Sequence, residues 1–316
     1  MKLLDFAILA LFFIVVGLGA FIAFLITNDV EVYEGMGTIS QDTKGTISQS
    51  MGAEQFYPNI RFPDTEISYY LDPACDNKKQ KNILTAFSII ASKTYLNFYP
   101  SPEGEEPRIK VLCSNFVPGT DEKGHFVAGE GGPSELINVS NYYVILESKI
   151  SLYRADKCPT PQIALHELLH ALGFNHSSDP KSVMYPVSSC DQEVDESILQ
   201  EVNRLYSISS SPDLVIDSIS ASRVGNMLSF QANVSNKGFK IVQSANISVY
   251  NEGKFIRSFS LTEYPLPIGT TKILTVRNLK VPRDAGKFEF YVEMYLPSSE
   301  ISLDNNRLEV ALEREA

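Results

Sequence analysis

Residues 166–176 of the 316-residue chain read HELLHALGFNH. Positions i and i+4 of a helix share a face, so His166 and His170 can direct their imidazoles at one ion. Gly173 can adopt a left-handed conformation that ends the helix, after which the chain can turn back and present His176. Three imidazoles leave a fourth zinc position open for water, which is the ligand set of a catalytic zinc site.

Glu167 lies next to the first of these histidines and would be held near the zinc-bound water. Zinc lowers the pKa of bound water towards 7, and a carboxylate beside it can take the proton and later pass it to the leaving amine. The sequence therefore predicts one catalytic Zn²⁺ on His166, His170 and His176, with Glu167 as general base. The alternative is a solvated helix face with hydrogen-bonded histidines. It is disfavoured because three of the chain's four histidines fall in this rare extended pattern.

A methionine follows the third histidine, in the sequence SVMYP at residues 182–186. A methionine turn after HExxHxxGxxH is the metzincin signature. Residues 166–186 therefore resemble a matrixin-type metzincin, and weaker similarity covers about residues 58–207, including the segments 62–63, 67–73 and 205–206. The resemblance implies a zinc endopeptidase for peptide or protein substrates, built from a twisted mixed sheet plus helices in an α+β domain. It also implies that Met184 lies beneath the imidazoles and that Tyr185 and Pro186 form a wall of the substrate pocket.

Other features depart from that family. Matrixins often bind a second, structural zinc through further histidines, but only His125 remains here, so that site is not expected. His125 itself is expected to be a surface loop residue rather than a substrate contact. The glycine-rich run at residues 119–133 is expected to be a loop. Its segment 129–132 could hold calcium through backbone oxygens, although a mobile rim is the favoured interpretation.

Hydrophobic periodicity predicts the elements around the motif. Three strands and three helices are expected, at residues 66–71, 108–113 and 142–146 for the strands and at 78–98, 161–172 and 193–206 for the helices.

Beyond residue 212 the hydrophobic period changes to two, which predicts about seven strands and an all-β sandwich. Residues 251–253, Asn-Glu-Gly, are typical of a hairpin turn. The segments 212–216, 234–238 and 304–306 resemble a CARDB-type domain, an immunoglobulin-like adhesion module of archaeal or bacterial surface proteins, and imply a possible surface ligand. Glu300 with residues 304–306 could bind calcium, but a polar turn between the last strands is the favoured interpretation.

The N-terminal run from Phe6 to Ile26 carries no charge and is long enough to span a bilayer as a helix. Lys2 precedes it and acidic residues follow it, which predicts a cytoplasmic N-terminus and an exported remainder. A cleaved signal peptide is the alternative. The expected organisation is a transmembrane anchor at 1–27, a flexible stalk at 28–57, the peptidase domain at 58–209 and the sandwich at 210–316.

The cysteine content fits an extracellular location. The four cysteines are even in number, and two disulfides, Cys75–Cys113 and Cys158–Cys190, are favoured over other pairings and over free thiols. The net charge of −11 disfavours nucleic acid as a partner. The resulting hypothesis is a single-pass, membrane-anchored extracellular zinc endopeptidase. The alternative is a surface adhesion or scaffold protein with a catalytically retired peptidase domain, against which the intact Glu167 counts.

Overall fold

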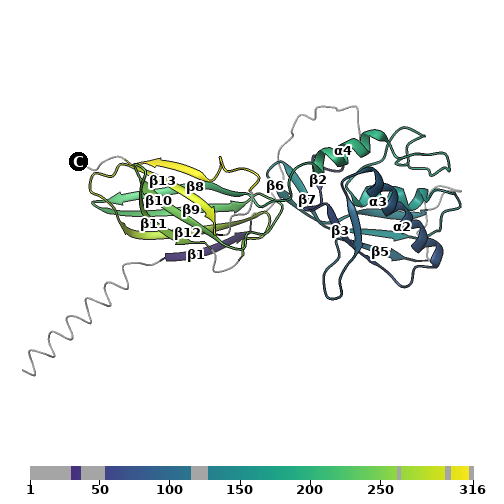
Figure 1. Cartoon of the computed structure of the whole chain (residues 1–316), viewed down its shortest axis with the longest axis horizontal. Coiled ribbons are helices and arrows are strands. Elements are labelled where there is room, and N and C mark those ends of the chain that lie inside the picture. Colours follow the sequence, from purple (N-terminus) through teal and green to yellow (C-terminus); the bar gives the residue numbers. More distant parts are fainter. Residues whose placement is uncertain (1–29, 37–53, 115–126, 262–264, 296–299, 313–316) are drawn as a thin grey trace, which may run out of the picture. The chain divides into compact units, whose positions relative to one another are not determined.

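The computed structural model describes residues 30–36, 54–114, 127–261, 265–295 and 300–312 (Figure 1). The contacts within the chain divide it into two units. The first unit is Thr38–Ser210, and the second unit is Met1–Gly37 together with Ser211–Ala316. Each unit has its own hydrophobic core.

A mixed sheet forms the centre of the first unit. Its strands are β2 (Ile60–Arg61), β3 (Glu66–Leu71), β4 (Asn97–Pro100), β5 (Ile109–Cys113), β6 (Gly129–Val139) and β7 (Tyr142–Leu152). The order is β2-β7-β5-β3-β4, and these neighbours run parallel. Strand β6 pairs with β7 in the antiparallel direction. The expected mixed sheet is therefore present, and it is antiparallel only at β6.

The three helices of this unit are α2 (Asn77–Lys93), α3 (Gln162–Ala171) and α4 (Glu196–Tyr206). Helices α2 and α3 pack against each other, and α3 also packs on β6 and β7 (Figure 1). The side chain of Asp76 caps α2 by accepting from two backbone N–H groups, those of Lys78 and Lys79. Because α3 packs on α2 as well as on β6 and β7, it is held between the sheet and a second helix.

The expected helix over 78–98 is too long at its C-terminal end. Helix α2 stops at Lys93, where Thr94 takes an extended conformation, and residues 97–100 join the sheet as β4. The apolar spacing continues through Tyr95 and Phe98, but Tyr95 is 62% exposed and Phe98 packs from the strand. Hydrophobic periodicity alone could not show where the helix ends, because the short strand that follows continues the same spacing of apolar residues.

The glycine-rich run contains the largest difference from expectation. Residues 129–139, expected to begin as a mobile rim, form the eleven-residue edge strand β6. Glycine has low strand propensity, so local preference predicts a loop there. Pairing with β7 along its whole length overrides that preference, and it extends β7 to Leu152, beyond the expected end at Leu146.

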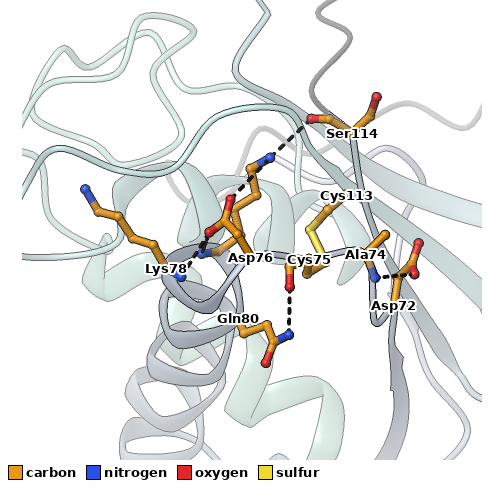
Figure 2. Close-up of a disulfide and its surroundings, with 9 residues drawn as sticks. Asp72, Ala74, Cys75, Asp76, Lys78, Gln80, Cys113 and Ser114 are labelled. Carbon is orange, nitrogen blue, oxygen red and sulfur yellow. Dashed lines mark hydrogen bonds and ion pairs between the residues drawn. A yellow bond between two sulfur atoms is a disulfide. The ribbon is translucent and has the colours of Figure 1, made fainter.

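Both favoured disulfides are present. Cys75–Cys113 joins the turn before α2 to the end of β5, and Cys158–Cys190 brackets the histidine motif. Figure 2 shows the first of these beside the N-terminus of α2. At this helix end, Lys79 Nζ donates to the carbonyl of Ser114 and lies 3.8 Å from Asp76 Oδ2. The start of α2 and the end of β5 are thus joined by a covalent bond and by polar contacts.

The second unit is a sandwich of two four-stranded antiparallel sheets. Its strands are β1 (Val30–Met36), β8 (Leu214–Val224), β9 (Met227–Asn236), β10 (Ala245–Asn251), β11 (Lys254–Ser260), β12 (Thr270–Lys280), β13 (Lys287–Met294) and β14 (Arg307–Ala311). One sheet has the order β1-β12-β9-β8 and the other β11-β10-β13-β14. The expected hairpin turn is confirmed, because Glu252 and Gly253 both have positive φ between β10 and β11.

Strand β1 corrects part of the expected stalk. Residues 28–57 were expected to be flexible, but Val30–Met36 pairs with β12 from Val30 against Val276 to Met36 against Thr270. The polar, glycine-rich composition of the segment hid a strand whose partner lies some 240 residues further on. Among the described residues no helix is long and apolar enough to cross a membrane; the run from Phe6 to Ile26 lies outside them.

Candidate metal centre

Three imidazoles converge at the C-terminal end of α3. His166 and His170 come from the helix, and His176 comes from the loop that follows Gly173, whose φ of +99° turns the chain. The Nε2 atoms lie 3.0 Å apart for His166 and His170, 3.2 Å for His170 and His176, and 3.3 Å for His166 and His176. Within the described part of the chain, these form the one group of three or more His, Cys, Asp or Glu side chains that could hold a metal ion.

The tautomers of two imidazoles fit a metal. His166 Nδ1 lies 2.7 Å from the carbonyl of Val183, and His170 Nδ1 lies 2.7 Å from that of Phe174. A carbonyl only accepts, so each Nδ1 carries the proton and each Nε2 presents a lone pair. Tetrahedral ligands at about 2.0–2.1 Å from Zn²⁺ stand roughly 3.3 Å apart. The observed separations match a trigonal face of such a site.

Electrostatics also favour neutral imidazoles. Burial lowers the pKa of His170 to about 4, and the neighbouring His166 adds to this effect. Burial likewise lowers the pKa of His166 and of His176. Because a metal binds only unprotonated imidazole, the site is prepared for an ion at neutral pH.

Glu167 is 5% exposed and faces the edge strand rather than bulk water. Burial raises the pKa of its carboxyl to about 8, and the negative charge of Glu130 contributes further. Strand β6 lies directly against this residue: a Cβ on Gly129 would stand 2.7 Å from Glu167 Cγ, and one on Gly131 would stand 2.2 Å from the Glu167 carbonyl oxygen. Glycines at these two positions therefore let the strand approach the helix.

The contact between β6 and Glu167 was not predicted from the sequence. Gly129, Glu130 and Gly131 belong to the functional neighbourhood, yet no motif marks them. The available signal is the spacing of the two glycines, because residues i and i+2 lie on the same face of a strand. If this run had been assigned to a strand, the spacing of its glycines would have indicated that another element approaches it closely.

The loop after His176 is tied into the domain through Met184, which is fully buried. The backbone N–H of Ser177 donates to the carbonyl of Met184 at 2.9 Å, and Met184 N donates to Ser182 Oγ at 3.0 Å. Ser182 Oγ in turn donates to Asp195, which precedes α4. The methionine thus holds the third histidine's loop in place. Tyr185 is half-buried and Pro186 is exposed.

The segment before β2 packs on the other side of the same loop. Phe56 N donates to the carbonyl of Gly173, and Asn175 N donates to that of Glu54. The ring of Phe56 stacks on His170 with centroids 5.6 Å apart.

A cavity of about 390 Å³ opens beside His176, lined by Glu54, Asn175, His176, Ser177, Ser178, Met184, Asp195, Ser197 and Ile198. It contains one imidazole but not Glu167, so it is not by itself the catalytic cleft.

Comparison with known proteins bears on the first unit. The family model described as Matrixin matches residues 62–207, which include all three histidines, Glu167 and Met184. Residues 62–207 are a matrixin-type domain. The resemblance found in the motif therefore extends across the sheet and the three helices.

A curated relative of the matrixin-type domain supports the same class. The zinc metalloproteinase nas-14 of Caenorhabditis elegans is 26% identical over 126 residues, which are 38% of this chain and 20% of that protein. The chain thus spans about a fifth of the relative's length. Together the two matches support a metallopeptidase.

Solved structures similar to this chain include the CARDB domain of the PF1109 protein from Pyrococcus furiosus, determined in complex with di-metal ions. The identity is 20% and the TM-score 0.26, with 33% of this chain and 90% of that chain covered. A domain of a putative cell surface protein from Methanosarcina acetivorans is 22% identical, with a TM-score of 0.29 and coverage of 33% and 95%.

The structure brings most of the expected site residues together. His166, His170 and His176 converge, Glu167 is their neighbour, and Met184 anchors the loop between them and α4. The chain's fourth histidine, His125, which was expected to be a surface loop residue, lies outside the described residues.

Proposed function

We propose that this chain is a zinc-dependent endopeptidase anchored in the cell membrane, with both folded units outside the cell. The observation that carries the activity is the trigonal set of three Nε2 atoms beside a buried carboxyl, within a matrixin-type domain. The location rests on the uncharged run of residues 6–26 and on the two disulfides, which persist in oxidising compartments.

The metal would be held by His166, His170 and His176. When bound, Zn²⁺ supplies an activated water and polarises the scissile carbonyl. Glu167 would accept the proton from the attacking water and deliver it to the amine that leaves. Its burial suits this role, because a carboxyl in an apolar site binds the proton more readily than one in water.

The substrate would lie along β6 as an extended strand. Among the described residues, β6 is paired with β7 on one side only, so its other edge can accept main-chain hydrogen bonds. Gly129 and Gly131 face Glu167 from this strand, so a peptide bound along it would lie next to the general base. Tyr185 and Pro186 would form the wall of the pocket for the residue after the scissile bond.

The test is a cleavage assay on the purified full chain with a mixed-sequence peptide library, in parallel with zinc quantification. Glu167→Ala should retain zinc and lose cleavage by about 10²–10⁴-fold. Glu196→Gln, at an exposed glutamate in the first turn of α4, is the matched control and should cleave normally. Stoichiometric zinc without cleavage in the wild type would contradict the peptidase and favour the scaffold alternative.

A further inference from the structure

The edge strand beside the candidate metal centre carries only negative charge. Strand β6 contains two carboxylates, Glu130 and Glu135, and no lysine or arginine. Glu130 is exposed and stands between Gly129 and Gly131, the two glycines that lie against Glu167. Successive side chains of a strand point to opposite faces of the sheet. Glu130 therefore projects from the face turned away from α3, one residue from the positions that approach Glu167.

The pairing of β6 with β7 gives the same orientation. Glu130 lies opposite Ser151 in the register of the two strands. Ser148 Oγ donates to the carbonyl of Ala171 in α3 at 2.7 Å, so the side chain of Ser148 faces the helix. Ser151 is an odd number of residues away along β7, so Ser151 and Glu130 belong to the other face.

The carboxylate of Glu130 is oriented but not neutralised. Tyr153 Oη donates to Glu130 Oε2 at 2.8 Å, and this hydroxyl carries no charge. Lys149 lies two residues from Ser151 on the same face of β7 and is exposed, yet no ion pair joins it to Glu130. Within the described part of the chain, Glu130 Oε1 accepts no hydrogen bond, which leaves this oxygen open to a donor from outside the protein.

A peptide bound along the free edge of β6 would extend the sheet by one strand. Directly opposite residues of neighbouring strands place their side chains on the same face, where opposite charges attract and like charges repel. The peptide residue opposite Glu130 would therefore extend its side chain beside this carboxylate, while the residues before and after it project towards α3 and Glu167. The net charge of −11 also attracts cationic peptides to the chain.

We propose that Glu130 selects substrates that carry a lysine or arginine at the position opposite it. This inference rests on the proposed peptidase function and on the peptide path along β6. Because the glycines on either side of Glu130 lie against the general base, the selected position is within about two residues of the scissile bond. Tyr153 is a positioning residue, since its hydroxyl holds Oε2 while the substrate cation binds Oε1.

The experiment is cleavage of a mixed-sequence peptide library by the full, zinc-loaded chain, with the cleaved bonds identified by mass spectrometry. Lysine and arginine should be enriched, and aspartate and glutamate depleted, at one fixed position near the scissile bond. The preference should be about two- to fivefold in kcat/KM, the range of an exposed ion pair, and should fall with added salt. It should appear in KM rather than kcat, because this contact is the same in the ground state and the transition state.

Three variants test the contact and one controls for net charge. Glu130→Gln should remove the preference, Glu130→Lys should reverse it towards acidic residues, and Tyr153→Phe should weaken it without reversing it. Glu103→Gln removes the same charge at an exposed residue between β4 and β5, on the opposite edge of the sheet, and should keep the wild-type profile. Thermal unfolding followed by circular dichroism identifies any variant that fails to fold.

Peptide binding without cleavage separates this inference from the peptidase function. The probes are a fluorescently labelled Thr-Lys repeat peptide and its Thr-Gln counterpart, and their binding to the Glu167→Ala protein is measured by fluorescence anisotropy. Tighter binding of the lysine peptide that Glu130→Gln abolishes would support selection by Glu130, even if the wild type cleaves nothing and the peptidase function fails.

Two results would overturn the inference. Cleavage by the wild type without a charge preference, or with a preference that survives in Glu130→Gln, would leave the peptidase function intact and show that Glu130 does not select substrates. Glu130 would then only protect the strand edge from pairing with other chains. No cleavage together with equal binding of the two peptides would overturn both the peptidase function and this inference.

Discussion

Helix α3 and strand β6 contribute to the surroundings of the candidate metal centre in different ways. The helix and the loop after it hold the three histidines, Glu167 and the glycine turn within eleven consecutive residues. Strand β6 comes from about 35 residues earlier, contains no motif, and reaches Glu167 only through the pairing of β6 with β7. Metal chemistry is therefore encoded locally, whereas access to it depends on tertiary structure.

Removal of a disulfide has the largest expected effect on stability. It also separates what the histidine segment contributes to the metal site from what the rest of the fold contributes. Cys158–Cys190 encloses the histidine segment with a separation of 32 residues, and replacing both cysteines with alanine should cost about 3–4 kcal/mol. Because this bond restrains the segment that holds all three ligands, we expect zinc affinity to fall as well. Urea unfolding and a competition titration with a chelator measure the two quantities.

The matched control is the other disulfide. Cys75–Cys113 has a similar separation of 38 residues, so its removal should cost a similar free energy of unfolding. It lies outside the histidine segment, and zinc affinity should stay at the wild-type value. If both double variants lose zinc affinity equally, then the metal site does not depend on the histidine segment alone.

The contribution of β6 is tested by adding one methyl group. Gly131→Ala would place a Cβ 2.2 Å from the Glu167 carbonyl oxygen, a backbone atom that cannot move aside cheaply. We expect a loss of about 1–3 kcal/mol in the free energy of unfolding and weaker cleavage, with zinc still bound. Thermal unfolding and the peptide assay measure these effects.

Gly132→Ala is the control for this change. Its Cβ would meet no atom within 4 Å, so the free energy of unfolding should stay within about 0.5 kcal/mol of the wild type. If Gly131→Ala behaves like this control, then the close approach of β6 to α3 is not needed for stability or cleavage. The contrast drawn between α3 and β6 would then be wrong.

The contrast also explains what the sequence could predict. The histidine spacing predicted the helix and the convergence of His166, His170 and His176, because i, i+4 geometry and a glycine turn are local properties. The two disulfides and the alternating strands of the sandwich were predicted on similarly simple patterns. Strands β1 and β6 were missed because each is glycine-rich or polar and is held by a partner distant in sequence or by the packing of α3.

The smallest predicted effect is the pH dependence of the metal-free protein. Glu167 has an ordinary pKa of 4.5 that burial raises to about 8 in the folded state. The unfolded chain therefore binds fewer protons than the folded chain between these values, and stability falls as the pH rises through this window. His170 acts in the opposite direction, because its pKa falls from 6.5 to about 4 on folding, so stability rises with pH over that interval.

The two effects oppose each other between pH 4.5 and 6.5, and above 6.5 only the fall due to Glu167 remains. We expect the metal-free protein to lose about 1–2 kcal/mol between pH 6.5 and 8, measured by urea unfolding in the presence of a chelator. Glu167→Gln should abolish the fall, because its amide does not titrate. Glu130→Gln should reduce the fall only slightly, since burial is the larger cause and the charge of Glu130 the smaller one. If the two variants reduce the fall equally, then the charge on β6, and not the burial of Glu167 in the helix, determines the proton affinity of the Glu167 carboxyl.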